Sequence, residues 1–132
     1  MAFAPDSHAR SRLRKEIVIW LATTGLDGHP HVVPVWFWWD GATFLVYSIP
    51  GQKVRDIRAN SAVQLHLNSD PEGGDVVRIA GTARLVPGQA PAFKVPAYVR
   101  KYRSSIRENG WTPKEFSDQY HVAILIRPTR LH

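Results

Sequence analysis

The segment from Tyr47 to Asn60, YSIPGQKVRDIRAN, combines a strand end, a Pro-Gly turn and a helix start with a lysine in the first turn. The first turn of a helix exposes unpaired backbone N–H groups and carries a partial positive charge. A lysine there is unfavourable unless an anion is present. Ser48, Lys53 and the free amides therefore form a candidate phosphate site. A solvated lysine at a helix start gives the same pattern, and the motif alone does not decide between the two.

Two arginines follow on the same predicted helix. Arg55 and Arg58 lie three residues apart and so share a helix face, where they either extend the anion site or face solvent. Asp56 has the spacing to pair with Lys53.

Other kinds of chemistry lack support in the chain. His31, His66 and His121 show neither metal-ligand spacing nor matched acidic partners, so no metal site is predicted. There is no GxSxG element and no glycine-rich dinucleotide or triphosphate loop, so no catalytic side chain is assigned. The absence of cysteine excludes a disulfide scaffold, an iron–sulfur cluster and a thiolate zinc site.

The pattern of apolar and turn residues predicts one mainly-β domain over residues 1–132. Asp27-Gly28 and Asp40-Gly41 are hairpin turn signals, and Gly81 indicates a bend or bulge. Six strands and short flanking helices make a small antiparallel barrel. The predicted strands are 17–24, 31–39, 43–49, 62–68, 76–86 and 121–126, and the predicted helices are 7–16, 51–60, 90–109 and one capped by Thr112 and begun by Pro113.

The run from His31 to Trp39, HVVPVWFWW, is apolar on both faces. Such a strand needs cover from another layer or another chain, which predicts a homodimer. Pro34 places this stretch at a sheet edge or bulge. Most of the neighbouring aromatic residues are expected in the core, but a planar ring system can also pack against them, near Trp36.

The net charge of +6 attracts anionic partners. Nucleic acid is disfavoured, because its usual binding surfaces pair basic residues with exposed aromatic residues, and here the aromatic strands look buried. The basic N-terminus and the short apolar run from Ile17 to Ala22 predict neither a signal peptide nor a membrane span. The cytoplasm is the expected location.

Three segments in order resemble the pyridoxamine-5′-phosphate-oxidase-like split barrels, specifically the flavin/deazaflavin oxidoreductase branch. They are Leu21 to Gly41, Tyr47 to Leu67, and Arg78 to Val86, and together they span about half of the chain. The resemblance implies a six-stranded split β-barrel of the FMN-binding type, a homodimer, and a cofactor held in a groove between subunits.

By position, the resemblance makes Lys53 the ligand of the cofactor phosphate. It also implies two strands that line the ring, with Tyr98 and Trp111 as weaker candidates from the other subunit. The implied cofactor-binding residues are Val35, Trp36, Phe37, Tyr47, Ser48, Ile49, Gln52, Lys53 and Arg58.

Two departures from the family bear on the cofactor. Gln52-Lys53 stands where flavin-mononucleotide oxidases usually carry Arg-Lys, and the ending RPTRLH lacks the tryptophan of the vitamin B6 oxidases. These departures disfavour pyridoxamine-phosphate oxidation. The sequence most resembles the family members that use coenzyme F420, a 5-deazaflavin with an acidic oligoglutamate tail, so the resemblance favours F420 over FMN. The basic segments Arg10 to Lys15 and Arg100 to Arg107 are candidates to meet that tail.

The function expected from the resemblance is hydride transfer from reduced F420 to a small organic substrate. Tyr47 or bulk water is the candidate proton donor. An FMN-dependent oxidoreductase of the same fold, or a protein that stores the cofactor without catalysis, is the alternative.

Overall fold

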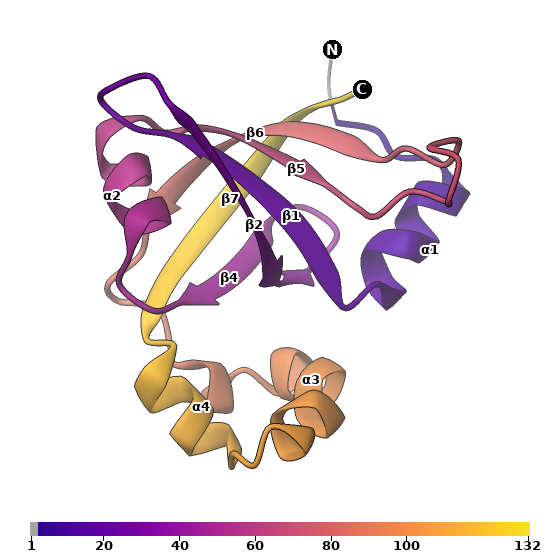
Figure 1. The fold of residues 1–132 in the computed structure, drawn as a ribbon. Coiled ribbons are helices and arrows are strands. Elements are labelled where there is room, and N and C mark those ends of the chain that lie inside the picture. Colours follow the sequence, from indigo (N-terminus) through magenta and orange to yellow (C-terminus); the bar gives the residue numbers. More distant parts are fainter. Residues whose placement is uncertain (1–2) are drawn as a thin grey trace.

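A single antiparallel sheet of seven strands forms the centre of the computed structural model, which describes residues 3–132 (Figure 1). The strand order is β2-β1-β5-β6-β7-β4-β3. The strands are β1 (Val18–Thr24), β2 (Pro30–Trp36), β3 (Trp38–Trp39), β4 (Phe44–Ser48), β5 (Ala62–His66), β6 (Arg78–Leu85) and β7 (Val122–Leu131). The helices are α1 (Ser7–Lys15), α2 (Gln52–Ala59), the 3-10 helix η1 (Ala92–Lys94), α3 (Pro96–Glu108) and α4 (Pro113–Gln119).

The two edge strands of the sheet, β2 and β3, are separated in the chain by Phe37 alone. The sheet therefore curls until its edges meet at Phe37, which gives the half-barrel expected from the sequence. The count of six strands was wrong, because the predicted strand 31–39 breaks at this residue. The Phe37 N–H donates to the Tyr102 hydroxyl at 2.8 Å, and the Phe37 carbonyl accepts from Lys101 Nζ at 2.9 Å. Because these backbone groups bond side chains of α3, Phe37 does not pair with a neighbouring strand.

The prediction that residues 31–39 are buried on both faces holds for Val35 to Trp39, which are buried or partly buried, but was wrong for residues 31–34. In β2, exposed residues alternate with partly buried ones, and Val32 is 51% exposed. The reason is position: β2 pairs only with β1 and forms an edge of the sheet, as Pro34 indicated.

Local turn chemistry is confirmed at both Asp-Gly signals. Gly28 has φ +79° and Gly41 has φ +100°, values that favour glycine. Each aspartate accepts a backbone N–H two residues on, from His29 at 3.0 Å and from Ala42 at 2.8 Å.

The predicted irregularity at Gly81 is a register shift between Ala80 and Gly81 in the pairing of β6 with β7. A Cβ atom at Gly81 would lie 3.0 Å from the carbonyl oxygen of Arg127, so any larger residue would require the neighbouring strand to shift. Pairing resumes beyond the shift, and β7 runs on to Leu131 instead of ending at residue 126.

The helices η1, α3 and α4 form a separate layer below the barrel in Figure 1. The predicted helix 90–109 is divided, because Val95 is extended and Pro96 opens α3. The capping box that begins α4 is confirmed: Thr112 Oγ1 accepts from the Glu115 N–H at 3.2 Å, and the Thr112 N–H donates to the Glu115 carboxylate at 3.0 Å.

Two apolar clusters hold these parts together. One fills the barrel and includes Leu13 of α1, and the other joins Leu45 and Tyr47 of β4 to the helical layer. Within residues 3–132, none of the helices has the length and apolar character needed to cross a bilayer.

Candidate functional site

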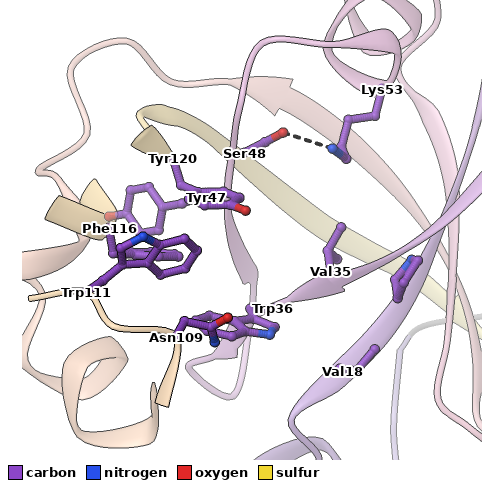
Figure 2. Close-up of a pocket in the computed structure, with 11 residues that line it drawn as sticks. Val18, Val35, Trp36, Tyr47, Ser48, Lys53, Asn109, Trp111, Phe116 and Tyr120 are labelled. Atoms are coloured by element: carbon purple, nitrogen blue, oxygen red, sulfur yellow. Dashed lines mark hydrogen bonds between the residues drawn. The ribbon is translucent and has the colours of Figure 1, made fainter. Parts of the chain in front are cut away.

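A pocket of about 280 Å³ lies where the barrel meets the helical layer (Figure 2). The barrel contributes the ends of β2 and β4 and the start of α2, and the helical layer contributes α4 and the turn before it. The lining residues are Val18, Pro34, Val35, Trp36, Tyr47, Ser48, Lys53, Asn109, Trp111, Phe116 and Tyr120. We call it the cofactor pocket, after the role that the resemblance implies for it. These lining residues are mostly apolar and aromatic, with one cation and no acid among them.

Lys53 provides that cation. Its Nζ donates to Ser48 Oγ at 3.0 Å, and the Ser48 hydroxyl donates in turn to the Ile49 carbonyl at 2.6 Å. Within residues 3–132, Lys53 forms no ion pair with a carboxylate. Burial lowers the pKa of Lys53 from its ordinary value of 10.5, since nothing offsets the loss of water around the charge. The side chain is therefore suited to an anionic ligand.

The start of α2 adds hydrogen-bond donors beside Lys53. Gly51 occupies the N-cap position and supplies no side-chain cap, so the first-turn amides lack the usual side-chain acceptor. The partial positive charge of this helix end and the Lys53 ammonium group both favour a phosphate or carboxylate.

The expected pairing of Asp56 with Lys53 does not occur. Asp56 is 1% exposed and accepts hydrogen bonds from Thr23 at 2.8 Å, His31 at 2.8 Å and Gln52 at 2.7 Å. Burial alone would raise its pKa, but the hydrogen bonds from Gln52, Thr23 and His31 outweigh burial and lower it. The Asp56 side chain points toward the barrel, where it meets Thr23 and His31, and so it does not neutralise the charge of Lys53.

Two other rings stack on the indole ring of Trp36. Tyr102 stacks on it at 4.6 Å between centroids and 6° between planes, and Phe116 does so at 5.4 Å and 18°. Both rings belong to the helical layer, Tyr102 to α3 and Phe116 to α4. Part of the Trp36 indole is therefore already covered within the chain, and the ring is less open to a ligand than the sequence suggested.

Tyr47 is oriented by the helical layer. Its hydroxyl donates to the Ala90 carbonyl at 2.5 Å, and its ring meets Tyr98 edge-on at 5.1 Å. Burial raises the pKa of Tyr47. A hydroxyl engaged in this way is poorly placed to donate a proton to a bound substrate.

The structure brings five of the nine residues implied by the resemblance into the cofactor pocket: Val35, Trp36, Tyr47, Ser48 and Lys53. The other four lie elsewhere. Phe37 is fully buried in the barrel corner, and Ile49 is 44% exposed outside the lining. Gln52 bonds Asp56 and Arg55, and Arg58 lines a different hollow with His121.

Sequence reasoning did not find Val18, Pro34, Asn109, Phe116 or Tyr120 as lining residues. Phe116 and Tyr120 lie four residues apart on a predicted helix and stack at 4.7 Å, so their spacing was an available signal. Trp111 lines the pocket of its own chain, whereas Tyr98 is fully buried beneath it.

A family model described as pyridoxamine 5′-phosphate oxidase matches residues 5–132. The chain belongs to the pyridoxamine 5′-phosphate oxidase family. This establishes at family level the resemblance on which the sequence interpretation depended. No curated protein sequence matches the chain at a significant level.

Solved structures agree with the family assignment. A protein described as an F420 reductase is 26% identical, with a TM-score of 0.70 and coverage of 98% of each chain. A FAD-binding protein from Mesorhizobium loti is 21% identical, with a TM-score of 0.64 over 97% of this chain and 92% of the other. HutZ, a heme storage protein from Vibrio cholerae, is 17% identical, with a TM-score of 0.62 over 96% and 92%. The last two comparisons support the fold alone.

Proposed function

We propose that this member of the pyridoxamine 5′-phosphate oxidase family is an oxidoreductase that uses coenzyme F420 to reduce a small organic substrate. The observation that carries the proposal is Lys53, a partly buried cation without a carboxylate partner, next to uncapped helix amides in a pocket of otherwise neutral lining. The similarity to an F420 reductase over 98% of both chains supports this choice of cofactor.

The residues present fit a phosphate-bearing ring cofactor. Lys53, Ser48 and the first-turn amides of α2 would hold the phosphate, and Val35, Trp36, Tyr47 and Trp111 would border the ring. When bound, a deazaflavin supplies hydride transfer. The protein would bind and orient the cofactor and limit access of water to it.

A second candidate is a protein that binds or stores a flavin-type cofactor, including FMN, without catalysis. The specific observation in its favour is that no Asp, Glu or His lines the pocket. Of the two proton donors expected from the sequence, Tyr47 is bonded to Ala90, which leaves water.

The homodimer remains a prediction and belongs to this proposal. A second copy would cover the exposed edge strand β2, and would close the cofactor pocket from outside. The cytoplasm remains the expected location, on the sequence grounds given above.

Titration with oxidised F420 and, separately, with FMN tests the cofactor. Trp36 and Trp111 line the pocket, so ligand binding should quench tryptophan fluorescence. We expect tighter binding of F420 than of FMN, followed by oxidation of reduced F420 when a suitable acceptor is supplied. Equal or tighter binding of FMN would overturn the choice of cofactor, and tight F420 binding without turnover on a broad acceptor panel would favour the storage protein.

A further inference from the structure

A second pocket, of about 380 Å³, lies between α1, β3 and α3. Leu13, Arg14, Trp38, Trp39, Ala97, Arg100 and Lys101 line it. We call it the α1/α3 pocket. It shares no lining residue with the cofactor pocket, and Phe37 separates Trp36 of that pocket from Trp38 of this one. Three of its seven lining residues are cations and none is acidic.

Two of the three arginines of α1, Arg10 and Arg14, lie over Trp39, which lines this pocket. The guanidinium carbon of Arg14 lies 5.1 Å from the Trp39 ring centroid, and that of Arg10 lies 5.5 Å from the same ring. Within residues 3–132, neither arginine forms an ion pair. Two like charges held at one ring repel each other, and an anion between them would relieve that repulsion.

Lys101 adds a third charge from α3. Its Nζ donates to the Phe37 carbonyl at 2.9 Å and lies 3.6 Å from the Phe37 ring centroid. Burial lowers the pKa of Lys101 to about 8, and Glu16 raises it only in part. The Glu16 carboxylate is already bonded to Arg12 Nε at 3.2 Å, so it does not neutralise the pocket.

We propose that the α1/α3 pocket is a second binding site, for a small anion with two or more negative charges, such as a diphosphate or a tricarboxylate. Arg14 and Arg100 present planar guanidinium groups that bind phosphate or carboxylate oxygens in pairs. Trp38 and Trp39 form an apolar wall that keeps water from one side of the ligand and strengthens the charge interaction.

The oligoglutamate tail of F420 is not the ligand that this geometry favours. The tail is joined through the cofactor phosphate, and Lys53 lies at the opposite end of the cofactor pocket from Trp36 (Figure 2). The α1/α3 pocket adjoins the Trp36 end. The second site is thus independent of the proposed F420 function.

Calorimetric titration of the whole protein at fixed low salt, with inorganic pyrophosphate and with citrate, tests the site. Arg14→Gln and Arg100→Gln should each weaken binding of the preferred anion by about tenfold or more, since each removes a charge-assisted contact. The matched control is Arg103→Gln, also exposed on α3 but outside the lining, which should bind within about twofold of wild type. Tighter binding of pyrophosphate supports a phosphate ligand, and tighter binding of citrate supports a carboxylate ligand.

Lys53→Met separates this site from the cofactor pocket. The variant removes the anion site proposed at Lys53, so the anion binding that remains is assigned to the α1/α3 pocket. The variant should keep the affinity that Arg14→Gln and Arg100→Gln weaken. The proposal is overturned if Lys53→Met abolishes anion binding, if Arg14→Gln and Arg100→Gln both bind as wild type does, or if neither anion binds saturably.

Discussion

The hydroxyl of Tyr102 accepts a hydrogen bond from the backbone N–H of Phe37 at 2.8 Å, across 65 positions of the chain. The same oxygen lies 2.6 Å from the Ile17 carbonyl, to which it donates. Phe37 is the point where the two sheet edges meet, and Ile17 precedes the first strand. One side chain of the helical layer therefore fixes the corner of the barrel beside the cofactor pocket.

Removing that hydroxyl should destabilise the fold. Tyr102→Phe keeps the ring that stacks on Trp36 but leaves the buried Phe37 N–H without its partner, at a cost of about 1–3 kcal/mol in the free energy of unfolding. Tyr98→Phe is the matched control. Tyr98 is equally buried one turn away, and its hydroxyl has no hydrogen-bond partner among residues 3–132, so loss of that hydroxyl should be neutral or stabilising. Urea denaturation measures the free energy of unfolding of both variants. Equal losses in the two would contradict a stabilising role for the hydrogen bond between Phe37 and Tyr102.

The buried carboxylate of Asp56 should make stability depend on acid pH. Its folded pKa lies below the ordinary 3.8, so its contribution is present above that value and is lost as pH falls through the folded pKa. At pH 7, Asp56→Asn should lower the free energy of unfolding by about 2 kcal/mol or more, because an amide cannot accept from three donors equally well.

The control is Asp118→Asn, an exposed partner of Lys114, with an expected effect below about 0.5 kcal/mol. Chemical denaturation at several pH values between 7 and 3 measures the free energy of unfolding of both variants and of wild type. The difference in the free energy of unfolding between wild type and Asp56→Asn should become smaller as the pH falls. A difference that grows toward acid pH would contradict the lowered pKa of Asp56.

Lys101 should titrate near neutrality. We expect a midpoint of about 8 for its Nζ signal in an NMR pH titration, against 10.5 for an ordinary lysine. Because the folded value lies below the unfolded one, protonation opposes folding, and this group makes stability rise with pH between about 8 and 10.5. A midpoint near 10.5 would mean that Lys101 is solvated and not held against Phe37.

Assembly provides a further prediction. Val32 on the edge strand is 51% exposed and Ile49 beside the cofactor pocket is 44% exposed, and a second copy would cover such apolar surface. Light scattering after size exclusion should give twice the 14.9 kDa chain mass. A mass of one chain at micromolar concentration would argue against a groove shared between subunits.

Features with local causes could be predicted from the sequence. The Asp-Gly turns, the capping box at Thr112 and the irregularity at Gly81 each follow from a few adjacent residues. Ser48 and Lys53 were found together for the same reason, since one Pro-Gly turn joins the strand to the helix.

Features that depend on residues far away in the chain could not be predicted from the sequence. The break at Phe37 depends on Tyr102, and the stacking of Tyr102 and Phe116 on Trp36 depends on how the helical layer docks beneath the barrel. Asp56 had a plausible partner at Lys53 but found three donors, two of them, Thr23 and His31, on strands far away in the chain.

Cofactor affinity of Lys53→Met tests the central claim most directly. A charge-assisted hydrogen bond contributes about 1.5–3 kcal/mol, so the variant should bind F420 roughly tenfold to a hundredfold more weakly than wild type. Its stability without ligand should be unchanged or higher, because a partly buried, unpaired cation is removed. Arg58→Met, on the same helix but outside the cofactor pocket, is the control and should bind nearly as wild type does. The account is contradicted if Lys53→Met binds F420 as tightly as wild type while Arg58→Met does not.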